Sequence, residues 1–113
     1  MGIRHGCFIR AVPGLSAYDG LTIAAWFINK KQDDSARDFL AATMTRVNQA
    51  LKAELMSEDT AYGITEKIND TFDALADKSY EKASESVSDA AVKAMDEAMQ
   101  KVLECEKEEI YES

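Results

Sequence analysis

The two residue types best suited to covalent chemistry, a histidine and a cysteine, stand close together near the N-terminus. His5 and Cys7 are two positions apart, so they share a face if the chain is extended there. Such a pair could act as a nucleophile and its base. A third, orienting group cannot be identified, and the segment that carries the pair has no scaffold to preorganise it. We therefore expect a protein that is not an enzyme, and keep catalysis by His5 and Cys7 as the weakest of three hypotheses.

Ligands for a metal ion or a cofactor are equally scarce. The chain has one His and two Cys, and Cys105 lies far along the sequence from Cys7. No Cys-x-x-Cys pair occurs, and the two acids within 57–59, Glu58 and Asp59, lack the alternation and the central Gly of a calcium loop. The sequence therefore predicts no metal site and no cofactor, and the two cysteines need not form a disulfide.

Carboxylates dominate the charged groups, with 21 acidic residues against 13 Lys and Arg and a formal net charge of −8. Acidic pairs four positions apart, such as Asp73 and Asp77, could act as acid and base only in a cleft that excludes water. On an exposed helix face they are solvated charge, which is the interpretation we favour. Four methionines could form an adaptable binding surface, although core filling is the better reading: Met44, Met56, Met95 and Met99.

The charge is unevenly distributed, with +3 over residues 1–31 and −11 over residues 32–113. An acidic surface repels nucleic acid, so direct nucleic-acid binding is not expected. It suits a partner protein with a basic surface. The longest apolar run, 23–28, is far shorter than the ~20 residues of a membrane span, so no membrane association is expected. With unpaired cysteines, these features favour the cytoplasm.

Four helices are predicted from apolar spacing and capping residues, over 16–31, 35–56, 59–76 and 79–106. Residues 1–14 read as an extended arm that ends at Pro13 and Gly14. The stripe of 59–76 and the stripe of 79–106 lie on nearly opposite sides of one continuous helix. A break near 77–79 resolves this conflict, and an unbroken helix would instead imply an oligomer.

The segment 21–28 is apolar on almost every side of a helix. Such a helix is either central in a bundle or half exposed at an interface, and the sequence leaves both possibilities open. Aromatic residues in and near it would be natural interface anchors if they were exposed. Phe39, Phe72, Trp26 and the methionines are expected to matter to the core, because the Ala-rich last helix buries little area.

The predicted fold is all-α: a small antiparallel four-helix bundle with an extended N-terminal arm and a long, Ala-rich C-terminal helix. In domain terms, 1–14 is the arm, 15–106 is the bundle, and 107–113 is an acidic tail that frays.

The leading functional hypothesis is a non-enzymatic protein-binding module, such as an inhibitor, chaperone or adaptor, and a homodimer is compatible with it. The second is a nucleic-acid mimic, whose acidic residues would occupy a DNA- or RNA-binding protein; interspersed lysines weaken it. The candidate partner-binding residues are four aromatic anchors and three acids: Phe8, Tyr18, Trp26, Phe27, Asp70, Asp73 and Asp77.

Overall fold

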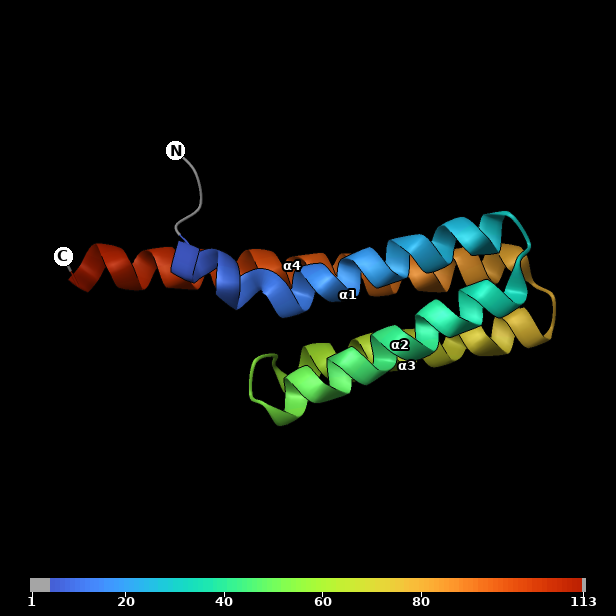
Figure 1. The fold of residues 1–113 in the computed structure, drawn as a ribbon, viewed down its shortest axis with the longest axis horizontal. Helices are drawn as coiled ribbons and strands as arrows, with labels where there is room; N and C mark the ends of the chain where they lie inside the picture. Colours follow the sequence, from blue (N-terminus) through green and yellow to red (C-terminus); the bar gives the residue numbers. More distant parts are fainter. Residues whose placement is uncertain (1–4, 113) are drawn as a thin grey trace.

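A computed structural model describes residues 5–112 of the chain, and the side chains of residues 6–108. Its four helices are α1 (His5–Asn29), α2 (Asp33–Lys52), α3 (Glu58–Ala76) and α4 (Tyr80–Glu112). α1 packs against α2 and α4, and α3 packs against the same two helices (Figure 1). The short connections at 30–32, 53–57 and 77–79 make consecutive helices antiparallel. The predicted all-α four-helix bundle is confirmed.

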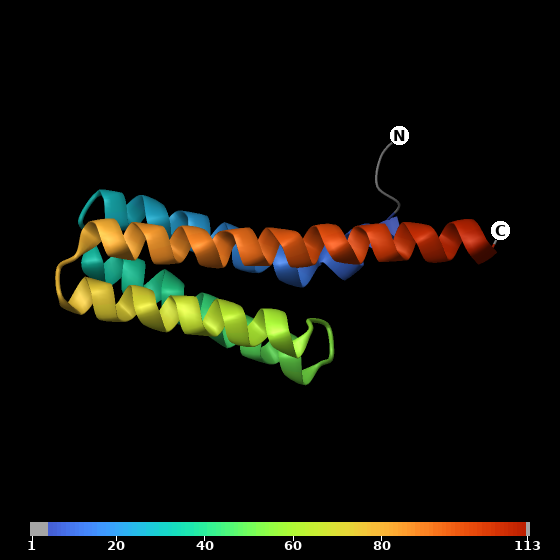
Figure 2. The same cartoon turned by 180° about the vertical axis from the view of Figure 1, so that it is seen from behind.

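The helices differ in length, and this difference exposes one end of the bundle. At ~1.5 Å per residue, α4 is ~50 Å long and α1 ~37 Å, whereas α2 and α3 are close to ~30 Å. The α1–α4 pair therefore projects beyond the α2–α3 hairpin at the end that holds both described termini (Figures 1 and 2). The contact between α1 and α4 is also the most extensive in the fold.

The predicted extended arm is wrong for the part of it that the structure describes. Residues 5–14 are the first turns of α1, and residues 1–4 lie outside the described part of the chain. Pro13 stands inside the helix, at a cost of ~3 kcal/mol in an isolated helix. Tertiary packing offsets that cost, since Cys7 and Ala11 are buried. The local stop signal of Pro13 and Gly14 is thus overridden.

The expectation of unpaired cysteines is also wrong. Cys7 and Cys105 form a disulfide across the α1–α4 pair, with their Cα atoms 5.4 Å apart. Both side chains are buried. The pairing could not be foreseen from an extended arm, because only an α1 that reaches back to His5 brings Cys7 level with Cys105 on the antiparallel α4.

The break between the third and fourth helices lies where the opposed stripes predict it. α3 ends at Ala76 and α4 begins at Tyr80. Lys78 has a positive φ of 59°, and Ser79 N–H bonds back to the Ala74 carbonyl, which closes the end of α3. At the other end of α4, residues 107–112 continue the helix, so the predicted frayed tail is helical where it is described.

The core is aliphatic, which corrects the expectation that aromatic residues dominate it. Its largest fully buried side chains belong to leucine, isoleucine and valine, whereas Trp26 and Phe39 are exposed and Phe72 is half-buried. The open question about 21–28 has a divided answer. Leu21, Ala24 and Ile28 are buried in the core, while Ile23 and Trp26 face outward.

Membrane insertion of a helix is not supported by the described residues. None of the four helices combines the length and the apolar character that crossing a bilayer requires.

Candidate functional site

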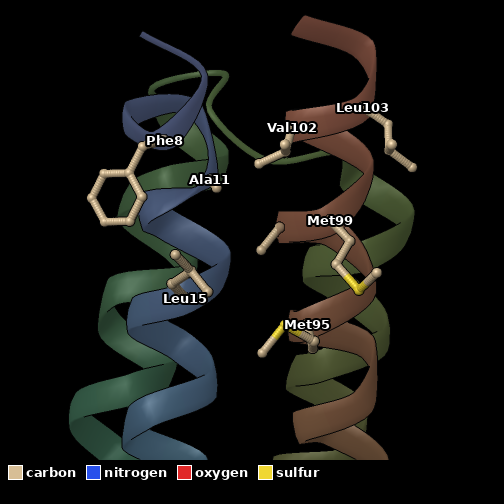
Figure 3. Close-up of a pocket in the computed structure, with 8 residues that line it drawn as sticks. Phe8, Ala11, Leu15, Met95, Met99, Val102 and Leu103 are labelled. Atoms are coloured by element: carbon tan, nitrogen blue, oxygen red, sulfur yellow. The ribbon is translucent and has the colours of Figure 1, made fainter. Parts of the chain in front are cut away.

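An apolar groove runs between α1 and α4 on the side that faces away from α2 and α3. We call it the outer groove. Its volume is about 300 Å³, and every side chain that lines it is apolar: Phe8, Ala11, Leu15, Met95, Ala98, Met99, Val102 and Leu103. In Figure 3 the ribbons of α2 and α3 lie behind these side chains.

The shape of the outer groove follows from small residues where the two helices meet and large ones beside them. Ala11 and Ala98 are buried at the helix contact. Phe8 stands on the α1 side, and Met99 and Leu103 stand on the α4 side (Figure 3). Leu15, Met95 and Val102 lie between these two walls. Small residues at the helix contact, with large residues on either side of it, leave a shallow trough between the two helices.

The walls of the outer groove are far more exposed than large apolar side chains usually are. Phe8 is 46% exposed, Met99 56% and Leu103 61%. The exposed apolar surface continues along both helices, since Val12 lies one turn from Phe8 and Val92 lies two turns from Met99.

Two of the four predicted aromatic anchors are exposed. Phe8 forms one wall of the outer groove. Trp26 is 54% exposed and lies 18 residues, or five turns, further along α1, which places it on the same side as Phe8. Tyr18 is half-buried and packs against the core. Phe27 is also half-buried, and its ring stacks on Phe39 with the centroids 5.5 Å apart.

Two of the three predicted acidic residues, Asp70 and Asp73, lie on α3, and Asp77 is the residue that caps its C-terminal end; all three are away from the outer groove. Asp70, Asp73 and Asp77 are exposed and line a polar hollow between α3 and α4. Lysines share this hollow, and Lys67 makes an ion pair with Asp89 at 3.6 Å. The structure therefore does not bring these acids together with Phe8 and Trp26.

Sequence reasoning missed most of the outer groove. Core filling is the preferred sequence-based reading of Met95 and Met99, and neither Val102 nor Leu103 is among the candidate residues that the sequence offers. The signal that could have found the groove is that large apolar residues lie on more sides of α4 than its neighbouring helices can bury. Val92, Met99 and Leu103 recur at spacings of seven and four, on the side opposite the buried Ala90, Ala94 and Ala98.

A second polar cluster, at the opposite end of the bundle, joins the start of α2 to the start of α4. The Lys78 ammonium donates to Asp33 Oδ2, and the Tyr80 hydroxyl donates to Asp33 Oδ1 at 2.9 Å. The hydrogen bond from Lys78 lowers the pKa of Asp33. Bonding to Asp33 raises the pKa of Lys78 and the pKa of Tyr80.

This cluster predicts how stability depends on pH. Because the pKa of Asp33 is lowered in the folded state, the ionised Asp33 side chain stabilises the fold above pH 3.8. This stabilisation is lost as the pH falls below that value. The difference in unfolding free energy between wild type and Asp33→Asn should therefore be steady near neutral pH and shrink in acid. Raised pKa values for Lys78 and Tyr80 predict a second loss above pH 10. Urea titrations across pH measure this difference, and a gap that widens in acid would contradict it.

The structure also bears on the proposed Cys–His chemistry. Cys7 Sγ is bonded to Cys105, so it is neither a thiolate nucleophile nor a metal ligand in this state. The His5 side chain lies outside the described side chains. Across the described residues, no group of three or more His, Cys, Asp or Glu side chains is arranged to hold a metal ion.

No protein-family model, no curated protein and no solved structure matches the chain.

Proposed function

We propose that this protein is a non-enzymatic protein-binding module that engages its partner through the outer groove. One observation carries the proposal: Phe8, Met99 and Leu103 stand about half exposed together on the side of the α1–α4 pair that faces away from α2 and α3.

The extent of this surface supports the proposal. Phe8, Met99 and Leu103 are each about half exposed, and the exposed Val12 and Val92 extend this apolar surface along the two helices. Contiguous apolar patches on the surface of a monomer are often functional. An inhibitor, a chaperone and an adaptor would each use such a surface.

The disulfide supports a location other than the cytoplasm predicted from the sequence. Disulfides persist in oxidising compartments and are rare where glutathione keeps thiols reduced. The Cys7–Cys105 bond joins the two helices that form the outer groove. We therefore place the working protein in an oxidising compartment or outside the cell.

The nucleic-acid mimic is the less supported alternative. A mimic needs a dense row of negative charge, close to the ~1.7 Å per charge of B-DNA. In the α3–α4 hollow, Lys67 and Lys82 interrupt the acids Asp70, Asp73 and Asp77. This arrangement favours protein binding through the outer groove over mimicry.

Photo-crosslinking in the cells that make the protein tests the proposal. A photoreactive residue replaces Leu103 in the outer groove or, as a matched control, Tyr62 on α3; both are 61% exposed. We expect a distinct adduct with a second protein from position 103 only, and expect Met99→Asp to abolish it. The same adducts from both positions, or none from position 103, would refute binding through the outer groove.

A further inference from the structure

We infer that the outer groove receives one amphipathic helix of a partner protein, with basic residues flanking its apolar face. This inference rests on the proposed function and adds the chemistry of the partner. It follows from three properties of the groove: the backbone around it, its dimensions, and the charges along its edge.

The backbone around the groove limits the mode of recognition. A partner strand needs an exposed sheet edge to pair with, and the backbone of both groove walls is helical. Polyproline segments dock between aromatic side chains, whereas Phe8 is the single aromatic residue among the lining residues. A helix needs neither feature, since it lays an apolar stripe into a trough between two other helices.

The dimensions of the groove suit a helix. Phe8 to Leu15 covers two turns of α1, or ~10 Å along the axis. Apolar side chains at positions i, i+3, i+4 and i+7 of a partner helix span the same length. The volume of about 300 Å³ leaves room for a few such side chains. Met95 and Met99 on α4 can adjust to their shapes, because methionine is flexible and polarisable.

The charged residues beside the groove favour a partner with positive charge. Asp96 and Glu104 share a hollow with Met99 and Leu103, next to the groove on α4. Asp19 lies one turn beyond Leu15 on α1 and is exposed. Within residues 6–108, where side chains are described, none of these three carboxylates makes an ion pair. Lys107 is the single basic residue in the α4 hollow.

These charges also argue against a second copy of the chain as the occupant. Two copies that met through this face would bring the same carboxylates together, and each chain has a formal net charge of −8. Like charges that face each other across an interface weaken it. A basic helix would gain from the same carboxylates, both in affinity and in the rate of encounter.

Three designed helical peptides test the inference on the full oxidised chain. The first has leucines at i, i+3, i+4 and i+7 and lysines elsewhere. The second has the same composition in scrambled order, which controls for attraction to any basic peptide, and the third has glutamates in place of lysines. At ~0.15 M salt, where long-range attraction is screened, we expect the first to bind at least about tenfold more tightly than either other peptide in fluorescence anisotropy.

Variants of the chain locate that binding. Leu103→Asp should weaken binding of the leucine–lysine peptide at least about tenfold, whereas Tyr62→Asp, at an equally exposed position, should not change it. A double change of Asp96→Lys and Glu104→Lys should erase the preference for lysine over glutamate.

The other outcomes would overturn the inference. Equal binding of the scrambled peptide, or tighter binding of the glutamate peptide, would show that a basic amphipathic helix is not what the groove selects. A wild-type mass of two chains in solution, together with a mass of one chain for Leu103→Asp, would show that a second copy covers the groove. These results would refute the partner chemistry alone. A crosslinked adduct between position 103 and another protein would still support the proposed function.

Discussion

Removal of the Cys7–Cys105 disulfide is expected to lower the free energy of unfolding by ~2–5 kcal/mol. The bond closes a loop over a sequence separation of 98, nearly the whole chain. A loop of that length loses much of its conformational entropy in the unfolded state when it is cross-linked, which favours the folded state. In the folded state the bond holds together the end of the α1–α4 pair that projects beyond the α2–α3 hairpin (Figures 1 and 2).

The measurement compares oxidised and reduced wild type with the double variant Cys7→Ala, Cys105→Ala in urea denaturation. Wild type should lose stability on reduction, while the double variant should not respond to the reductant. Hydrogen exchange should rise most at residues 6–12 and 99–108, because the disulfide pins these segments together. Since Phe8 and Leu103 lie in them, reduction should also weaken binding at the outer groove. Equal stability of all three forms, or a free thiol titre in the native protein, would contradict the prediction.

Replacement of Gly14 by alanine is expected to destabilise the fold by ~1–3 kcal/mol, even though alanine is the better helix former. A Cβ at position 14 would lie 2.8 Å from the Ala94 carbonyl oxygen and 2.9 Å from the Ala98 nitrogen. Both are backbone atoms of α4, so no side-chain rotation can relieve the clash. The two helices would have to move apart, which would weaken the buried contact on which the outer groove is built.

Gly20→Ala provides a contrast that makes the glycine prediction specific. A Cβ at position 20 would collide with the hydroxyl of Thr43, a side chain on α2 that donates to the Phe39 carbonyl at 2.7 Å. Gly20→Ala should therefore cost ~1–3 kcal/mol, and adding Thr43→Ala should restore much of the loss.

No second substitution should rescue Gly14→Ala in the same way. Gly6→Ala serves as the control, since its Cβ would meet nothing within 4 Å, and it should be neutral or stabilising. Thermal and urea unfolding measure all of these variants. A Gly14→Ala protein as stable as wild type would show that α1 and α4 do not approach as closely as the structure has them.

Local sequence signals predicted the helices well wherever periodicity and capping agreed. The helix predicted over 35–56 is α2, although it ends earlier, at Lys52, and leaves Leu55 exposed. Ser57, just before the helix predicted over 59–76, caps α3, since its Oγ accepts from the Thr60 N–H at 3.3 Å. The opposed stripes of the last two helices predicted their break, because one straight helix cannot bury two opposite faces in one core.

The N-terminal third shows where local signals fail. Taken alone, Pro13 and Gly14 predict the end of a secondary-structure element, yet both lie within α1. Gly14 is there because the α4 backbone comes too close for a side chain, and the sequence around position 14 does not record that neighbour. The disulfide belongs to the same contact between α1 and α4. The wrong prediction for residues 1–14 therefore concealed both the disulfide and the close approach of α4 to Gly14.

The sequence by itself determined the fold class and the negative surface, since periodic apolar residues and an excess of acids are local and compositional properties. Only the tertiary structure decided which apolar residues stay uncovered. Two neighbouring helices each have more apolar faces than their partners can bury, and their side-by-side placement turns Phe8, Met99 and Leu103 into one groove. Burial depends on residues distant in the chain, and for that reason the outer groove could not be predicted from spacing alone.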